Sequence, residues 1–202
     1  MKKTLLICFL LLLALALTGC GLLGGEYTYH KLPDGTVEIT KYNGKAETLE
    51  VPGELGGKTV TDIGAYAFSD CVRLRSVKLP DSVTSIGDLA FLFCRYLTSV
   101  TLSEGLTKIG DSAFSNCGML TSVTIPYGVT DIGDNAFYNC QALTSVTIPD
   151  TVARIGKDAF SVPQTGNGSF TAPIEGLTVT VPRGSRAEQY CRENGLKYAY
   201  SD

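Results

Sequence analysis

A 23-residue repeat is the feature that most limits how this 202-residue chain can fold. Ile-Gly and Ala-Phe pairs recur five times at this interval, starting at Ile63 and Ala67. A period of roughly 20–29 residues with coincident apolar positions is typical of a leucine-rich-repeat solenoid. Three further columns share the period, namely Cys71, Cys94, Cys117 and Cys140, then Leu74, Leu97, Leu120 and Leu143, then Val77, Val100, Val123 and Val146.

Each copy also carries the pattern of a short strand with one buried face. In residues 120–125, apolar side chains alternate with threonine and serine, as expected when successive side chains point to opposite faces of a sheet. One copy offers too little apolar surface to offset the entropy of ordering it, so neighbouring copies must bury both faces of each layer. Gly64 and its equivalents lie where the chain leaves the strand, at a turn that is expected to tolerate no side chain.

The unit in residues 129–149 resembles the BspA-type leucine-rich repeat of bacterial surface proteins. The resemblance covers roughly residues 60–182. It implies a curved, right-handed stack with a surface binding or adhesion role and no enzymatic activity. The fold class that we expect is a mostly β repeat solenoid with short helical turns, a β-rich N-terminal cap and a helix-plus-strand C-terminal cap.

The first twenty residues have the pattern of a lipoprotein signal peptide. Lys2 and Lys3 precede an uncharged run over residues 5–17, which is shorter than the roughly 18 residues of a spanning helix. The run ends in Leu17-Thr18-Gly19-Cys20, which resembles a bacterial lipobox and implies lipidation of Cys20. We expect a protein in the cell envelope, lipid-anchored to a bacterial membrane and facing outside the cytoplasm. An ordinary secretory signal is the alternative.

The two ends differ from the repeat, as the caps of a solenoid must. Strand-like segments flank the turn signal at Pro33-Asp34-Gly35, Ser185 and Glu188 have capping-box spacing, and residues 162–176 are expected to be an inserted surface loop. The tail resembles the family's C-terminal cap, so the chain is expected to be complete. The expected divisions are a signal peptide (1–19), a lipid-anchored linker (20–26), an N-terminal cap with an irregular first rung (27–62), the solenoid (63–182) and a C-terminal cap (183–202).

Charge and residue types exclude several functions. The net charge is −3, and loss of Lys2 and Lys3 with the signal peptide makes it −5, which argues against nucleic acid as a partner. His30 is the single histidine, and no nucleophile elbow, phosphate loop or metal-ligand cluster is present in the sequence. We therefore expect no enzyme, no cofactor and no metal, and membrane contact only through the lipid anchor.

Polar and sulfur columns within the repeat favour structural roles. Asp88, Asp111 and Asp134 are expected to cap short helical turns and not to bind calcium. The cysteine column is expected to hold free, buried thiols, because a small hydrophobe with a weak S–H donor fits each position. A third column, just before the cysteines, is expected to form turn hydrogen bonds and comprises Asp70, Asn116 and Asn139.

The function that we expect is a cell-surface binding or adhesion module that presents a leucine-rich-repeat face to a protein or glycan ligand, with an acidic partner favoured. A passive envelope scaffold and, less favoured, a glycan-acting hydrolase are the alternatives. Basic and aromatic side chains gather at the N-terminal end of the strand face, although its threonines also suit any exposed strand. The candidate binding residues are Arg73, Arg75, Lys78, Arg95, Tyr96, Thr98, Thr101, Thr121, Thr124, Thr144 and Thr147.

Overall fold

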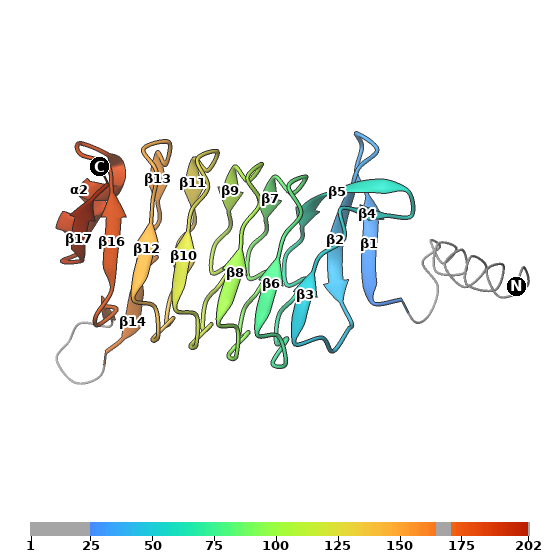
Figure 1. The fold of residues 1–202 in the computed structure, drawn as a ribbon, viewed down its shortest axis with the longest axis horizontal. Helices are drawn as coiled ribbons and strands as arrows, with labels where there is room; N and C mark the ends of the chain where they lie inside the picture. Colours follow the sequence, from blue (N-terminus) through green and yellow to red (C-terminus); the bar gives the residue numbers. More distant parts are fainter. Residues whose placement is uncertain (1–24, 165–170, 202) are drawn as a thin grey trace, which may run out of the picture.

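The computed structural model describes residues 25–164 and 171–201. Its rungs stack along one axis, with a β-rich cap at the N-terminal end and a helix at the C-terminal end (Figure 1). In the repeats, strands of neighbouring rungs pair in parallel, and each strand residue lies opposite the residue 23 positions later, as in Ile63↔Ile86 and Val123↔Val146. The predicted repeat solenoid and its period are therefore confirmed.

Two rows of short strands line the stack. The first row is one sheet, in the order β1 (Tyr27–Lys31), β2 (Val37–Tyr42), β5 (Lys58–Ile63), β7 (Ser85–Ile86), β9 (Lys108–Ile109), β11 (Asp131–Ile132) and β13 (Arg154–Ile155). The second row is divided into β3 (Thr48–Glu50), β6 (Ser76–Lys78) and β8 (Ser99–Thr101), followed by β10 (Ser122–Thr124), β12 (Ser145–Thr147), β16 (Thr178–Val181) and β17 (Lys197–Tyr200). Between β8 and β10 the stack continues, with the Thr121 N–H donating to the Thr98 carbonyl at 3.3 Å.

A column of phenylalanine rings runs through the core. Each rung contributes one buried ring, and neighbouring centroids from Phe68 to Phe160 lie 4.8–5.3 Å apart. Tyr42 continues the column at 5.2 Å on the N-terminal side, and Tyr190 closes it edge-on at 6.2 Å. Every ring is thus covered by the rungs on both sides, which is why one copy cannot bury its own core.

The glycine column permits close approach of successive rungs. A Cβ atom on Gly133 would lie 2.5 Å from Asp111 N and from Gly110 C, and one on Gly156 would lie 2.3 Å from Asp134 N. Neither glycine has a positive φ. The prediction that this turn tolerates no side chain is confirmed, and the reason is contact between rungs.

The aspartate column joins rungs and does not cap helical turns. Asp88 Oδ1 accepts from the Asp111 N–H at 2.9 Å, and Asp111 Oδ1 accepts from the Asp134 N–H at 2.8 Å. The residue after each aspartate has a left-handed φ, 60° at Leu89 and 54° at Ser112, so the chain turns away at once. The prediction of local caps is therefore wrong, because each of these carboxylates accepts from a backbone N–H of the next rung and not from its own turn.

The column before the cysteines also links rungs. Asp70, Asn116 and Asn139 have φ of 58–62°, a conformation that aspartate and asparagine tolerate. Asn139 Nδ2 donates to Asn116 Oδ1 at 2.7 Å, which forms a side-chain ladder along the stack. A predicted turn hydrogen bond is present at Asn139, whose Oδ1 accepts from Gln141 Nε2 at 2.8 Å, and the Asn139–Asn116 bond between two rungs was not predicted.

The N-terminal cap consists of two hairpins. β1 and β2 pair in antiparallel fashion around the predicted turn. The extra residues before Ile63 form β4 (Glu54–Leu55), which pairs with β5 across Gly56 and Gly57, whose φ values are 59° and 70°. Such a two-residue turn requires positive φ, which glycine supplies without strain.

The C-terminal cap is α2 (Arg186–Glu193) followed by β17, which lies parallel to β16. Ser185 Oγ accepts from the Glu188 N–H at 3.1 Å, and Glu188 Oε2 accepts from the Gly184 N–H at 2.6 Å. Residues 162–176 were expected to be a loop, but the described parts form the antiparallel strands β14 (Ser161–Pro163) and β15 (Thr171–Pro173).

Cys20 and the predicted signal peptide lie outside the described residues, as does most of the predicted linker. Within residues 25–164 and 171–201, none of the helices has the length and apolar character needed to cross a bilayer.

Candidate functional site

The strands β6, β8, β10 and β12 form one face of the stack and carry four of the predicted binding residues (Figure 1). The other seven predicted residues lie in the turns just before these strands. Lys78 pairs in register with Thr101, and Thr124 with Thr147. Lys78, Thr101 and Thr124 are exposed, and Thr147 is half-buried. The structure therefore brings these four side chains into two adjoining segments of a single column.

In one of the two predicted threonine columns, the hydroxyl groups form hydrogen bonds between rungs. Thr98 Oγ1 donates to the Arg75 carbonyl at 2.8 Å, Thr121 Oγ1 to the Thr98 carbonyl at 3.3 Å, and Thr144 Oγ1 to the Thr121 carbonyl at 3.2 Å. These hydroxyl protons hold successive rungs together and are not free for a ligand. Within the described residues, the side chains of Thr101, Thr124 and Thr147 form no such bond, so the available hydroxyls are theirs.

The basic residues of the strand face have acidic neighbours that sequence reasoning missed. Glu47 lies 3.4 Å from Arg75 and 3.9 Å from Arg73, and Glu50 lies 3.9 Å from Lys78. Alignment of Pro52 with Pro80 would have placed both glutamates opposite these cations. All these side chains are solvent-exposed, so each ion pair contributes only about 0–1 kcal/mol.

Two of the predicted cations pack against aromatic rings. The Arg75 guanidinium lies 6.0 Å from the Tyr96 ring centroid, which confirms that these two residues come together. The Arg95 guanidinium lies 5.3 Å from the Phe93 centroid, in the turn that precedes β8. Arg95 is therefore on the edge of the stack beside the strand face.

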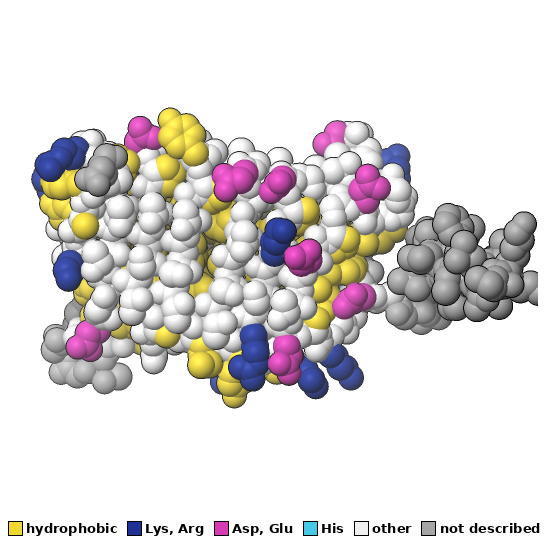
Figure 2. Space-filling view, viewed as in Figure 1, with side chains coloured by type: hydrophobic (Ala, Val, Ile, Leu, Met, Phe, Trp, Pro, Cys, Tyr) yellow, Lys and Arg dark blue, Asp and Glu magenta, His cyan; other side chains and the backbone are white. Residues whose placement is uncertain are grey.

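That edge carries an exposed apolar strip. Val72, Tyr96 and Met119 are 47%, 50% and 44% exposed, and they occupy the same turn on three consecutive rungs. We call the set formed by Val72, Arg73, Arg95, Tyr96 and Met119 the turn ridge. Figure 2 shows hydrophobic and Lys/Arg atoms gathered along the edge beneath β6, β8 and β10. Sequence reasoning missed Val72 and Met119 because it followed charged and hydroxyl residues.

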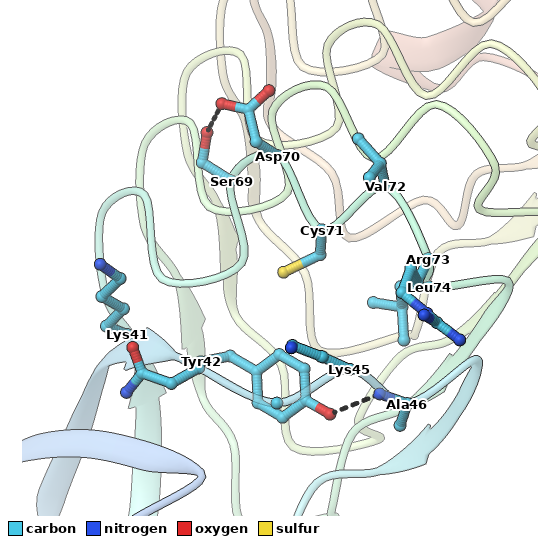
Figure 3. A pocket seen from close by; sticks show the side chains of 12 residues that line it. Lys41, Tyr42, Lys45, Ala46, Ser69, Asp70, Cys71, Val72, Arg73 and Leu74 are labelled. Atoms are coloured by element: carbon cyan, nitrogen blue, oxygen red, sulfur yellow. Dashed lines mark hydrogen bonds between the residues drawn. The ribbon is translucent and has the colours of Figure 1, made fainter. Parts of the chain in front are cut away.

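A cavity of about 270 Å³ adjoins the N-terminal end of the turn ridge. It lies between residues 41–46 of the cap and residues 69–74 of the first repeat turn. Figure 3 shows the Tyr42 ring on one side, and the Cys71 sulfur projects towards the space between the two segments. Val72 and Arg73 belong to both the cavity and the turn ridge, so the two are continuous.

The cysteine column lies directly behind this cavity. Cys94 Sγ donates to the Phe68 carbonyl at 3.1 Å, and Cys117 and Cys140 make the equivalent bond at 3.3 and 3.2 Å. Burial raises the pKa of Cys140 to about 12, and the neighbouring Cys94 thiol together with burial raises the pKa of Cys71. Because the thiolate is the nucleophile, these groups are unreactive at neutral pH. The predicted burial is confirmed for Cys94, Cys117 and Cys140 and is wrong for Cys71, which is half-buried at the cavity, while the free thiol state stays a prediction.

His30 and the carboxylates form no recognisable catalytic or metal centre. His30 lies on β1, and its Nε2 is 3.0 Å from Glu38 Oε2 on β2. In the part of the chain that the structure describes, no three His, Cys, Asp or Glu side chains are arranged to hold a metal ion. Among the described residues, the strand face and the turn ridge with its cavity are the candidate ligand-binding features.

The fold and these columns define a leucine-rich-repeat solenoid. The family model for the BspA type leucine-rich repeat region matches residues 42–165 in six copies. The chain belongs to this family. No match was found among curated proteins.

Solved structures of bacterial leucine-rich-repeat proteins are similar to this chain. The T. pallidum leucine-rich-repeat protein TpLRR is 28% identical, with a TM-score of 0.69 over 86% of this chain and 95% of its own. A leucine-rich cell surface protein from Faecalibacterium prausnitzii is 31% identical, with a TM-score of 0.64 over 80% of this chain and 39% of its own. A leucine-rich-repeat protein from Bacteroides capillosus is 36% identical, with a TM-score of 0.55 over 62% of this chain and 95% of its own.

Proposed function

We propose that this protein is a binding module of the bacterial cell surface, anchored by a lipid on Cys20, that presents its strand face to a protein or glycan ligand. Similarity to a leucine-rich cell surface protein supports the location. The lipobox pattern ending at Cys20 supports the anchor. An acylated cysteine holds a protein at a bilayer without a spanning helix, because each buried methylene contributes about 0.8 kcal/mol.

The observation that carries the proposal is the composition of the strand face. The exposed Lys78 is followed in register by Thr101, and Thr124 and Thr147 continue the column on the next rungs. Arg75 and Tyr96 flank this column at its N-terminal end. An extended ligand with acidic groups would pair with the cations and run along the free hydroxyls.

Glutamates 47 and 50 modify this proposal. They already neutralise part of the cationic end, so a ligand must displace exposed ion pairs before it can pair with Arg75 or Lys78. Those pairs are individually weak, and the displacement costs little. Binding should weaken as salt rises, because exposed charges are screened over about 8–10 Å.

A binding experiment with protein and glycan arrays tests the proposal. The probe protein is the mature chain carrying Cys20→Ser, compared with the same chain carrying Arg75→Glu and Lys78→Glu. Lys108→Glu with Lys157→Glu is the control, since it makes the same charge change elsewhere on the molecule. Binding to an array component should be lost only with the first pair of substitutions. A chain that binds nothing would instead be a passive envelope scaffold.

A further inference from the structure

We propose that the turn ridge and the adjoining cavity form a docking site for an acidic protein segment that contains large apolar side chains. This inference rests on the proposed function and deepens it, because it names both the class of partner and the edge of the solenoid that binds it. The strand face next to it would then bind the rest of the same ligand.

The first argument is the arrangement of exposed apolar groups. Five large hydrophobic side chains among the described residues are strongly exposed, and three of them belong to the turn ridge. The turns that carry them stack directly, since the Asp70 N–H donates to the Leu92 carbonyl at 2.8 Å and the Phe93 N–H to the Ser115 carbonyl at 3.0 Å. Tyr96 and Met119 thereby occupy one column, with Val72 one position away on the preceding rung, and neighbouring exposed apolar groups mark interaction sites.

The second argument selects a protein over a glycan. Val72 and Met119 have no strong hydrogen-bonding group, whereas a sugar presents mainly hydroxyls. Methionine adapts its shape to different apolar partners, and tyrosine and arginine are enriched where protein interfaces carry their energy. The turn ridge combines all three residue types on adjacent rungs.

The third argument is charge. Lys41, Lys45 and Arg73 surround the cavity, and Arg95 follows along the turn ridge. Their acidic neighbours are Asp70, in the cavity wall, Glu47, which pairs with Arg73, and Glu26, which accepts from the Tyr42 hydroxyl at 2.9 Å. The four cations thus exceed the three carboxylates by one. Arg95 has no carboxylate within ion-pair distance among the described residues and packs on Phe93 instead. A basic patch on a chain of net charge −3 complements an acidic partner.

The cavity adds an anchor point. Its volume of about 270 Å³ is below the roughly 300–1,000 Å³ of small-molecule sites, and it is open to the turn ridge through Val72 and Arg73. A space of this size suits one side chain of a peptide that lies along the turn ridge. Tyr42 lies in the cavity wall but is only 5% exposed, so the exposed Val72 and the half-buried Cys71 offer the apolar surface for that side chain (Figure 3).

Short fluorescent peptides test the proposal by anisotropy against the mature chain carrying Cys20→Ser. The probes are a pooled library that mixes Asp and Glu with Phe and Leu, the same library with Ser in place of Phe and Leu, and a sulfated oligosaccharide. The first library should bind most tightly. Equal binding of the serine library or of the oligosaccharide would overturn the proposal, because it would show that charge alone is recognised.

Substitutions then locate the site. Tyr96→Ser with Met119→Ser should weaken binding of the first library by at least about tenfold, as expected when interface anchor side chains are removed. Tyr127→Ser is the matched control, because Tyr127 is exposed but lies in a different turn of its rung. Unchanged binding after the double substitution would overturn the inference. If Arg75→Glu with Lys78→Glu still abolished array binding in that case, the proposed function would stand without it.

Discussion

The close approach of rungs at the glycine column predicts a large effect of one added methyl group. In Gly133→Ala, the new Cβ would lie 2.5 Å from Asp111 N, Asp111 Oδ1 and Gly110 C. Carbon contacts are normally about 3.5–4.0 Å, so the two rungs must separate locally by about 1 Å. None of the three atoms is the end of a flexible side chain free to move away, because Asp111 Oδ1 is itself hydrogen-bonded.

The separation strains two rung-to-rung bonds. The Gly133 N–H donates to the Ile109 carbonyl at 2.9 Å, and the Asp134 N–H donates to Asp111 Oδ1 at 2.8 Å. Gly133 is buried, and its N–H left without an acceptor costs about 1–3 kcal/mol, whereas the Asp134 bond is solvent-exposed and its loss adds little. Replacing glycine by alanine also stabilises by about 0.4–1 kcal/mol through the unfolded chain. The expected net loss is about 1–2 kcal/mol in the free energy of unfolding.

Urea denaturation followed by far-UV circular dichroism measures this loss. Gly118→Ala is the matched control, because its added Cβ would meet no atom within 4 Å and its φ is not positive. That substitution should leave the free energy unchanged or raise it by up to about 1 kcal/mol. Similar stabilities for the two variants would refute the argument that the glycine column is required for rung contact.

Three further predictions follow from single positions. Tyr66→Asn should raise the melting temperature by about 2–4 °C, since Tyr66 is exposed with a φ of 58° and asparagine relieves about 1 kcal/mol of left-handed strain. Tyr127→Asn, at a position without positive φ, should give no such gain. Cys20→Ser should release the protein from membranes, and a wild-type chain free in the medium with an unmodified N-terminus would contradict lipidation. The cysteine column should be fully alkylated in denaturant without reductant, and a shortfall of two or four alkyl groups at those positions would show disulfides.

The repeat made much of the fold predictable. Alternation of apolar and polar side chains identifies the buried face of each strand, and the 23-residue interval identifies which residues stack on one another. Ile63, Val77 and Phe68 could be placed in the core from that pattern alone, and all three are buried. Parts of the caps were also predictable, since the helix cap at Ser185 and the turn at Pro33-Asp34-Gly35 depend on residues close in sequence.

Features set by partners distant in sequence were harder to predict. The carboxylate of Asp88 binds an N–H 23 residues away, so its sequence neighbours suggested a helix cap that does not form. The pairing of Glu47 with Arg75 depends on how the cap docks on the first rung. Exposure of Met119 depends on the path of its turn, and a methionine beside a leucine column gives no sign of it in the sequence.

Met119 offers the most direct test of the proposed docking site. The sequence has two methionines, Met1 and Met119, so a chain processed at Cys20 retains a single methionine, within the turn ridge. Its ¹³C-labelled methyl group gives one NMR signal, which can be followed while the acidic and apolar peptide library is added. The signal should shift in step with binding and should not shift with the serine library. Binding of the peptides with an unmoved Met119 signal would contradict the turn ridge as the docking site.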